Sequence, residues 1–392
     1  MENQIILKDA HIPNIKSLEV YLKAGGYEGI RKILSQGQEW GRQEVEKSNF
    51  RERKIAGKHI CDLWKQNSKS NLKLVLTCFE SGPGCFKENY LLANHPHLII
   101  EGILILAYLL NLHEATIVIK GELVKEYRDF CNLLEECTKE GFLGTNIFGS
   151  TFSFSLLAIR SGGGVAEQDE SILISLLKGK KAVPFVESTK DEFYVIQQIE
   201  TICSLPWIMI NGGEKFKQLG NDYSGGTKLV GLSGDIKNPG VYEVSLGSSL
   251  HDIILKNGNG VANEKAIKVV IASGKELNFI SVCELEKVKI EFSLENCSII
   301  VLDEDRCLRD CLEWVVEHYN GESCGDCTPC REGIFWANQI MAKEYLQDFP
   351  TDDLNQIREI SRNINFSAKC NFAGWFSRSI DSLLKIEQTS ET

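Results

Sequence analysis

Three cysteines stand within seven residues near the C-terminal end of the sequence. Cys324, Cys327 and Cys330 follow a Cys-x2-Cys-x2-Cys spacing in the segment ESCGDCTPCREG. The Gly and Pro between them keep the segment from being helical, so the three thiolates can face one point. Bacterial [4Fe–4S] proteins use the same spacing, and such a cluster needs a fourth ligand. Downstream of Cys330 the candidate is Cys370, between two predicted helices.

Four thiolates also bind zinc, so spacing alone leaves alternatives open. Zinc sites with four cysteines usually consist of two separated Cys-x2-Cys pairs. Three cysteines in a row followed by one distant cysteine favour the cluster over zinc and over free thiols. The remaining ten of the 14 cysteines show no tight pattern and are interpreted as reduced, partly buried thiols: Cys61, Cys78, Cys85, Cys131, Cys137, Cys203, Cys283, Cys297, Cys307 and Cys311.

Composition excludes several classes of protein. The 392 residues carry a formal net charge of -11, which disfavours a nucleic-acid-binding role because phosphate-binding surfaces are normally basic. The most apolar stretch, residues 98–112, contains Glu101 and is too short to cross a bilayer, so we interpret it as a buried helix. The N-terminal residues lack the pattern of a secretory signal. We therefore expect a cytoplasmic protein without direct membrane insertion.

The chain divides into four predicted regions. Residues 1–70 are charged and helical, with two short amphipathic segments broken at Gly25-Gly26. Over residues 71–224 apolar strand patterns alternate with helical ones, which predicts an α/β layer with a mostly parallel sheet. Residues 225–303 are typical of a small α+β module, and residues 304–392 of a helical bundle of four amphipathic segments. The predicted strands of the α/β layer are 72–79, 115–121 and 152–160, and its helices 97–112, 122–141 and 170–179.

At ESCGDCTPCREG the sequence resembles the NADH-binding flavoprotein subunit of respiratory complex I, which recurs in soluble NAD-linked hydrogenases and formate dehydrogenases (NuoF/HoxF/HydB type). The resemblance covers nearly the whole chain through LEVYLKAGGYEGIRKIL, ESGPGCFKE, ETICSLPWIMINGG and GTKLVGLSGDIKNPGVYEV. It implies a Rossmann-like FMN and NADH domain, then a ubiquitin-like β-grasp module of the soluble-ligand-binding type (SLBB), then the bundle. It also implies that the bundle's four cysteines hold a [4Fe–4S] cluster that receives electrons from the flavin.

The first flavin loop departs from the family pattern, which reads approximately LRGRGGAGFPTGxKW. Three of its glycines are replaced here by Glu52, Lys54 and Ile55, and Gly57 remains. Glycine allows backbone N–H groups to approach a phosphate closely, sometimes at positive φ, and a β-branched residue suits such a conformation badly. The carboxylate of Glu52 would also place a negative charge near the negatively charged phosphate. The family's aromatic residue and lysine are replaced by Lys58 and Leu63.

The other residues that the resemblance implies as flavin and NADH contacts are also mostly replaced in this sequence. Polar and aromatic side chains of the family are replaced by Thr77, Phe79, Gly82, Val165, Asp169 and the pair Gln197-Gln198. The retained positions form an expected vestigial flavin site that consists of Gly57, Glu80, Glu170 and Thr201. The glycine-rich stretch 161–164 is, by itself, more typical of a strand-to-helix turn than of a nucleotide site.

The cluster motif is intact while the flavin motifs are degraded. We therefore predict a subunit that relays single electrons through one [4Fe–4S] cluster and has lost hydride chemistry. FMN and NAD(H) are accordingly doubtful cofactors. Expected partners are other iron–sulfur and flavoprotein subunits, including a thioredoxin-like [2Fe–2S] subunit and an intact flavoprotein paralogue. The first alternative is an active FMN-containing NADH dehydrogenase. The second is a non-catalytic interaction module in which residues 227–303 bind a partner.

Overall fold

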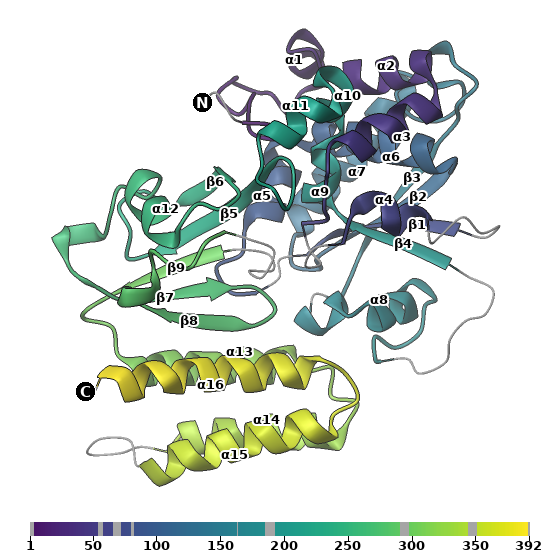
Figure 1. Ribbon diagram of the computed structural model, residues 1–392. Helices are drawn as coiled ribbons and strands as arrows, with labels where there is room; N and C mark the ends of the chain where they lie inside the picture. Colours follow the sequence, from purple (N-terminus) through teal and green to yellow (C-terminus); the bar gives the residue numbers. More distant parts are fainter. Residues whose placement is uncertain are drawn as a thin grey trace.

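The computed structural model describes residues 4–53, 58–65, 72–79, 82–162, 164–184, 193–290, 298–343 and 351–390. Figure 1 shows three parts in chain order. Purple and blue helices surround a parallel sheet, a green mixed sheet follows, and yellow helices run below that mixed sheet. The predicted succession of an α/β layer, a small mixed module and a helical bundle is therefore what the chain forms.

The first sheet has four parallel strands in the order β3-β2-β1-β4. The predicted strands are confirmed, whereas β4, which lies beyond β1 at the other edge, was not expected. The chain places β2 and β4 on opposite sides of β1, so the strand order reverses its direction at β1. Ligands of open α/β sheets bind at the carboxyl ends of the strands at such a reversal. The strands are β1 (Leu72–Cys78), β2 (Glu114–Ile119), β3 (Ser155–Arg160) and β4 (Phe193–Gln198).

Both faces of this sheet are covered, as expected for parallel strands. Successive side chains of a strand point to opposite faces. Leu74 and Leu76 of β1 join the large core that includes the N-terminal helices. Val75 packs on the other face with Leu173 of α8. The helices of this region are α5 (Lys87–Asn94), α6 (Pro96–Leu110), α7 (Val124–Lys139) and α8 (Glu170–Leu177).

The predicted apolar helix is α6, and it is buried almost all round. Pro96 occupies its first turn, where the missing N–H costs nothing. Asn111, at φ 56°, ends it in the left-handed conformation. Among the described residues, no single helix meets the length and composition test for a membrane span; α5 and α6 meet it only as a pair bent by 96°.

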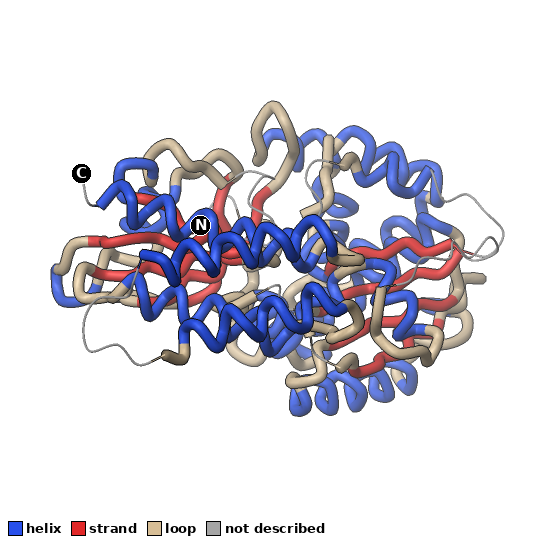
Figure 2. The backbone as a smooth tube through the Cα atoms, turned by 90° about the horizontal axis from the view of Figure 1, so that it is seen from below, coloured by secondary structure: helices blue, strands red, loops and turns tan. Residues whose placement is uncertain are grey.

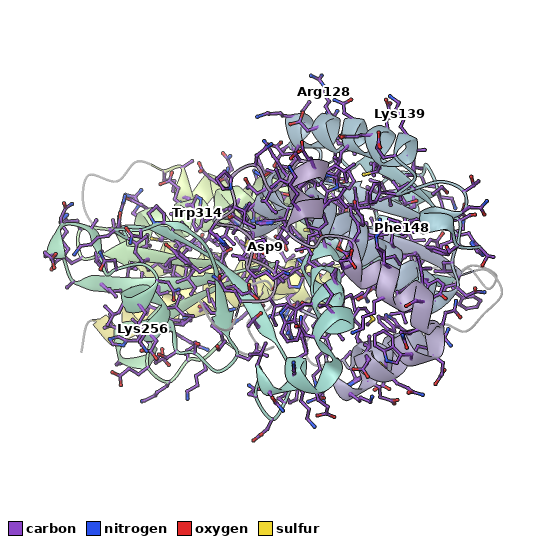
Figure 3. All side chains as sticks on the ribbon, turned by 90° about the horizontal axis from the view of Figure 1, so that it is seen from above. Asp9, Arg128, Lys139, Phe148, Lys256 and Trp314 are labelled. Atoms are coloured by element: carbon purple, nitrogen blue, oxygen red, sulfur yellow. The ribbon has the colours of Figure 1, made fainter. Side chains whose placement is uncertain are left out.

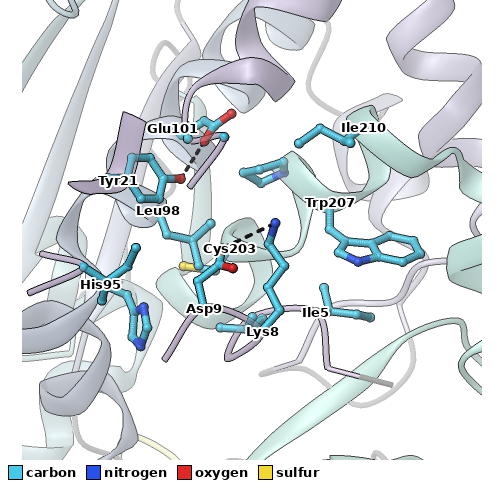
Figure 4. A pocket seen from close by; sticks show the side chains of 15 residues that line it. Ile5, Lys8, Asp9, Tyr21, His95, Leu98, Glu101, Cys203, Trp207 and Ile210 are labelled. Atoms are coloured by element: carbon cyan, nitrogen blue, oxygen red, sulfur yellow. Dashed lines mark hydrogen bonds and ion pairs between the residues drawn. The ribbon is translucent and has the colours of Figure 1, made fainter. Parts of the chain in front are cut away.

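The N-terminal helices pack onto the same core instead of forming a separate one. Helix α2 contacts α10 and α6, and a buried carboxylate, Glu101 of α6, accepts hydrogen bonds from the N–H groups of Tyr27 and Gly29 at 2.9 Å each. Figure 4 shows Glu101 beside Tyr21 in this region. The helices involved are α1 (Leu18–Lys23), α2 (Glu28–Gln36), α3 (Gln38–Lys47), α4 (Ile60–Lys65), α9 (Ile199–Cys203), α10 (Leu205–Asn211) and α11 (Gly213–Gln218).

The second sheet is mixed, with the strand order β6-β5-β9-β7-β8 and one parallel pair, β5 with β9. Apolar side chains of α12 (Leu250–Lys256), such as Ile253 and Ile254, pack in one core with this sheet. The predicted α+β module with one helix is confirmed in this form. Its strands are β5 (Thr227–Gly234), β6 (Gly240–Ser245), β7 (Ile267–Ser273), β8 (Leu277–Ser281) and β9 (Ser298–Asp303).

The four predicted C-terminal helices form two layers. Figures 1 and 2 show α13 and α16 side by side next to the second sheet, with α14 and α15 outside them. The edge strand β8 donates its N–H groups at Leu277 and Phe279 to hydroxyls of α16, Ser379 at 2.8 Å and Ser382 at 2.6 Å, so the helix covers an exposed sheet edge. The helices are α13 (Leu308–Glu322), α14 (Thr328–Met341), α15 (Thr351–Ser367) and α16 (Phe372–Ser390).

Candidate functional site

The three clustered cysteines lie at the turn between α13 and α14. Cys324 and Cys327 stand in the non-helical connection, and Cys330 lies in the first turn of α14. Gly325 adopts φ 70°, a conformation that a residue with a Cβ rarely takes. Pro329 starts α14, where its missing N–H is tolerated. The sequence therefore makes a sharp turn that directs thiols from the connection and from the helix toward one region.

Short polar contacts hold this turn. The hydroxyl of Ser323 lies 3.5 Å from the sulfur of Cys330 and accepts the N–H of Gly325 at 3.3 Å. Arg331 donates to the carbonyl oxygen of Gly325 at 3.0 Å and pairs with Glu332 at 2.9 Å. Arg331 is half exposed, lies in the first turns of α14 and braces the cysteine turn.

Cys370 stands between α15 and α16 and is brought to the same end of the bundle. Burial is the main cause that raises the pKa of the Cys330 thiol to about 12; the hydrogen bond from Ser323 opposes this rise, and the nearby Cys327, Cys370 and Cys324 add to it. Burial likewise raises the pKa of Cys370 to about 11. Within the described residues, no three His, Cys, Asp or Glu side chains stand close enough to hold a single metal ion. A [4Fe–4S] cluster uses four thiolates as ligands, the number of cysteines near this end of the bundle.

A loop of the first sheet reaches this end of the bundle. A Cβ added to Gly164, in the connection after β3, would lie 3.6 Å from Oε2 of Glu322 at the end of α13. The carboxylate of Asp169, the N-cap of α8, is near enough to contribute to the raised pKa of Cys370. Ala166 of the same loop belongs to the core that includes Cys327 and Cys330. The carboxyl edge of the parallel sheet is thus connected to the cysteine site by direct packing.

The four predicted vestigial flavin residues are not all placed. Gly57 and Glu80 lie outside the described residues. Glu170 is exposed at the first position of α8, and Thr201 is fully buried in α9. The hydroxyl oxygen of Thr201 accepts the backbone N–H of Arg53 at 3.1 Å. Thr201 therefore holds the start of the first flavin-type loop against α9.

The carboxyl edge of β1 and β4 contains a buried charged network that the sequence did not predict. Lys87, at the start of α5, forms an ion pair with Glu200 of α9 and lies 3.8 Å from Glu88. The amide of Gln198 donates to Glu88. Glu200 also accepts the N–H of Leu229 in β5 at 2.8 Å, which links the two sheets. The sequence signal for this network was the position of its two charged residues: Lys87 follows strand β1 and Glu200 follows strand β4.

The charges of this network compensate one another. Burial opposes the charge on Lys87, but Glu200 and Glu88 more than offset it and raise its pKa. Burial acts to raise the pKa of Glu200, and Lys87 and Lys228 hold it below its usual value instead. The guanidinium of Arg53 is also buried and donates to the carbonyl oxygen of Gly225 at 2.8 Å. These cations are engaged by protein groups rather than directed to a phosphate.

Two hydrogen-bond acceptors at the same edge differ from these cations in having no protein partner in the described part of the chain. The side-chain oxygens of Gln197 and Gln198 are buried and without a hydrogen-bond partner among the described residues. A buried unpaired carbonyl oxygen is costly, so it accepts a hydrogen bond from a donor where one is available. The sheet edge thus has two acceptors open to a ligand's donors, whereas its buried cations, Lys87 and Arg53, already bond to protein groups.

Residues 310–386 match the NADH-ubiquinone oxidoreductase-F iron-sulfur binding region, and residues 45–207 match the Nuo51 FMN-binding domain. The F subunit of NADH-quinone oxidoreductase from Aquifex aeolicus is 31% identical, over 97% of this chain and 92% of the relative. The chain belongs to the family of NADH-quinone oxidoreductase F subunits. The protein called F 2 in Rhizobium meliloti, of the same family, is 30% identical over 98% of this chain and 96% of the relative. The family predicted from the cysteine motif is confirmed.

The fold of this NuoF-type chain is also that of a solved hydrogenase chain. A chain of the NAD+-reducing [NiFe]-hydrogenase in the H2-reduced state superposes with a TM-score of 0.79 at 22% identity. The match covers 92% of the present chain and spans 63% of the hydrogenase chain. At that identity the likeness establishes the fold alone. The chain is thus a family member with an α/β domain, a parallel sheet and a C-terminal helical iron–sulfur region.

Proposed function

We propose that this NuoF-type chain is an electron-transfer component of a multi-subunit NADH-dehydrogenase-type oxidoreductase, and that Cys324, Cys327, Cys330 and Cys370 hold its one [4Fe–4S] cluster. The observation that carries the proposal is the convergence of four thiols at one end of the bundle, against the loop that follows β3. The match of residues 310–386 to the family's iron–sulfur region supports it.

A [4Fe–4S] cluster in this position supplies one-electron transfer. The protein holds two of its proposed ligands, Cys327 and Cys330, in the buried core, while Cys324 and Cys370 are partly exposed. Burial on one side excludes water from part of the site, and partial exposure on the other leaves a short route to the surface. This arrangement suits a relay between the α/β domain and a partner subunit.

We further propose that the flavin and NADH sites of this chain have been lost and that another flavoprotein performs the hydride step. The proposal is supported by the buried cations at the sheet edge, Lys87 and Arg53, which are engaged by protein groups. It is also supported by the replaced glycines of the first loop. A thioredoxin-like [2Fe–2S] subunit and an intact flavoprotein paralogue are the proposed partners.

The proposed domains are residues 1–70, 71–224, 225–303 and 304–392. We propose that the second sheet is an SLBB-type β-grasp module, and its mixed strand order with helix α12 supports this. In this proposal it attaches the cluster bundle to the α/β domain, because Glu200 bonds to β5 on one side and α16 covers β8 on the other.

The second candidate function is an active FMN-containing NADH dehydrogenase. Two observations favour it: residues 45–207 match the family's FMN-binding domain, and the buried side-chain oxygens of Gln197 and Gln198 can accept hydrogen bonds from a flavin. In that case Gly57, Glu80, Glu170 and Thr201 would line the flavin site. A third candidate, a structural module that binds a partner through residues 227–303, would need neither flavin nor electron transfer.

Anaerobic purification of the complex, followed by assays of iron, acid-labile sulfide and extracted flavin on this chain, separates the three. We expect about four irons and four sulfides per chain, and no FMN. Stoichiometric FMN on this chain with NADH-driven bleaching would establish the second candidate. Zinc in place of iron would overturn the proposed cluster. A cluster that neither a reductant nor an oxidant can titrate would favour the third candidate, the structural module.

A further inference from the structure

The two segments that carry the proposed cluster ligands are joined by an ion pair. The ammonium nitrogen of Lys369 lies 2.9 Å from Oδ2 of Asp326. Asp326 stands between Cys324 and Cys327, and Lys369 directly precedes Cys370. The pair therefore connects the three-cysteine turn to the connection between α15 and α16, and it does so beside thiols that must close around one cluster.

The hydrogen bonds of the flanking side chains act within each segment, and apolar packing in the core that contains Cys327 and Cys330 also joins the two segments. Ser323 and Arg331 brace the three-cysteine turn internally, at 3.5 Å to Cys330 and 3.0 Å to Gly325. The connection between α15 and α16 continues from helical backbone bonds, such as Ala368 N–H to the oxygen of Ile364 at 2.9 Å. These hydrogen bonds fix the shape of a segment but do not set the distance between the two segments.

The opposite charges of Asp326 and Lys369 neutralise each other beside the proposed cluster site. A cluster held by four thiolates is anionic, so an unpaired carboxylate at Asp326 would repel it. The Lys369 ammonium cancels that carboxylate and is itself near Cys327 and Cys324, whose charges act on it. Both side chains are partly exposed, at 54% for Lys369 and 25% for Asp326, so water screens the pair and its effect should be moderate.

We propose that Asp326 and Lys369 form a clasp that positions Cys370 on the cluster, so that they are positioning residues for the fourth ligand. This inference rests on the proposed function, because it takes the four cysteines as ligands of one cluster. The clasp acts by holding two segments together, and it therefore depends on opposite charges at these positions and not on which position carries the cation.

The test uses the full chain with its cluster reconstituted anaerobically, in the variants Asp326→Asn, Lys369→Gln and the reversed pair D326K/K369D. The control is Lys256→Gln, which removes the cation of an exposed 3.0 Å pair with Asp252 on α12, in the second-sheet part of the molecule (Figure 3). One readout is the rate at which iron passes to a chelator. The other is the midpoint potential, followed by electron paramagnetic resonance.

We expect each single variant to release iron on the order of fivefold faster, the scale of one exposed ion pair, and the reversed pair to return close to the wild-type rate. Lys256→Gln should leave the rate unchanged. Single variants that release iron at the wild-type rate, even with a shifted potential, would overturn the clasp, as would a reversed pair as labile as the singles. A wild-type chain that holds no iron and sulfide after reconstitution would overturn the proposed function instead.

Discussion

The hydroxyl of Tyr21 donates a 2.6 Å hydrogen bond to Glu101, although the two residues are 80 positions apart in the sequence. They lie on the wall of a cavity of about 20 Å³, where Figure 4 marks the bond by a dashed line. Glu101 also accepts the N–H groups of Tyr27, Gly29 and Ile30. One buried carboxylate thus organises the start of α2 and attaches the N-terminal helices to α6.

Replacing Glu101 by Gln should destabilise the fold, because the new amide would direct its own hydrogens at groups that already donate. We expect a loss of about 2–4 kcal/mol in the free energy of unfolding, the scale for leaving buried donors unpaired. Denaturant titration at neutral pH measures it. Tyr21→Phe, which removes one donor only, should cost less than E101Q, and equal losses would contradict the central role of the carboxylate.

Breaking the buried ion pair between Lys87 and Glu200 should be more costly than breaking an exposed one. Lys87→Met removes the ion-pair partner of the Glu200 carboxylate at a fully buried position, and we expect a loss of about 3–5 kcal/mol. Thermal unfolding monitored by circular dichroism provides the measurement. Lys23→Met removes the exposed 2.6 Å pair with Glu19 and should leave the unfolding midpoint almost unchanged.

The double variant K87M/E200Q refines this prediction. Because it removes both charges, it should recover part of the loss seen in Lys87→Met. If the double variant were as unstable as the sum of its single variants, the two side chains would not act as a pair.

Cys370 should be necessary for cluster retention. In Cys370→Ser the fourth ligand becomes a hydroxyl, and we expect iron retention weaker by about tenfold or more. Iron and sulfide assays with the visible absorption of the purified chain test this. Cys283→Ser is the control, since Cys283 is exposed in the second-sheet module. Wild-type iron content in C370S would show that the fourth ligand lies elsewhere.

Stability should fall in mildly acidic solution because buried histidines resist protonation. Burial lowers the pKa of His97 to about 4, in a site where its Nδ1 lies 2.9 Å from the Tyr27 hydroxyl and 3.9 Å from the sulfur of Cys137. The unfolded chain then binds the proton first, so the contribution is present above about pH 6.5 and is lost as pH falls toward 4. The loss is up to about 2 kcal/mol at pH 5 for this histidine.

Urea unfolding at pH 7.5 and pH 5 measures that dependence. His97→Gln should make stability less sensitive to acid than in the wild type. Ile99→Val, a change in the same buried helix that adds no titrating group, should lower stability at both pH values by a similar amount. A wild-type acid sensitivity in H97Q would assign the effect to other groups, such as His95 and His318, whose pKa values burial also lowers to about 4.

The sequence by itself determined the elements with a strong local pattern. Apolar runs predicted β1, β2, β3 and the buried helix α6, and amphipathic periods predicted the four bundle helices, because burial of an apolar face repeats at a fixed spacing along the chain. The Cys-x2-Cys-x2-Cys turn was equally local. Strand β4 was missed since its segment, FYVIQQ, ends in two glutamines and follows a polar stretch.

Only the tertiary structure decided which distant residues meet. Asp326 and Lys369 are 43 positions apart, and Lys87 and Glu200 are 113 apart. No periodicity along the chain relates the members of either pair. Their contact depends on how α14, α15 and α16 pack and on which side of β1 the strand β4 adds. Whether a charge is buried and compensated is likewise set by desolvation among packed elements, and the sequence supplies only the residues that take part.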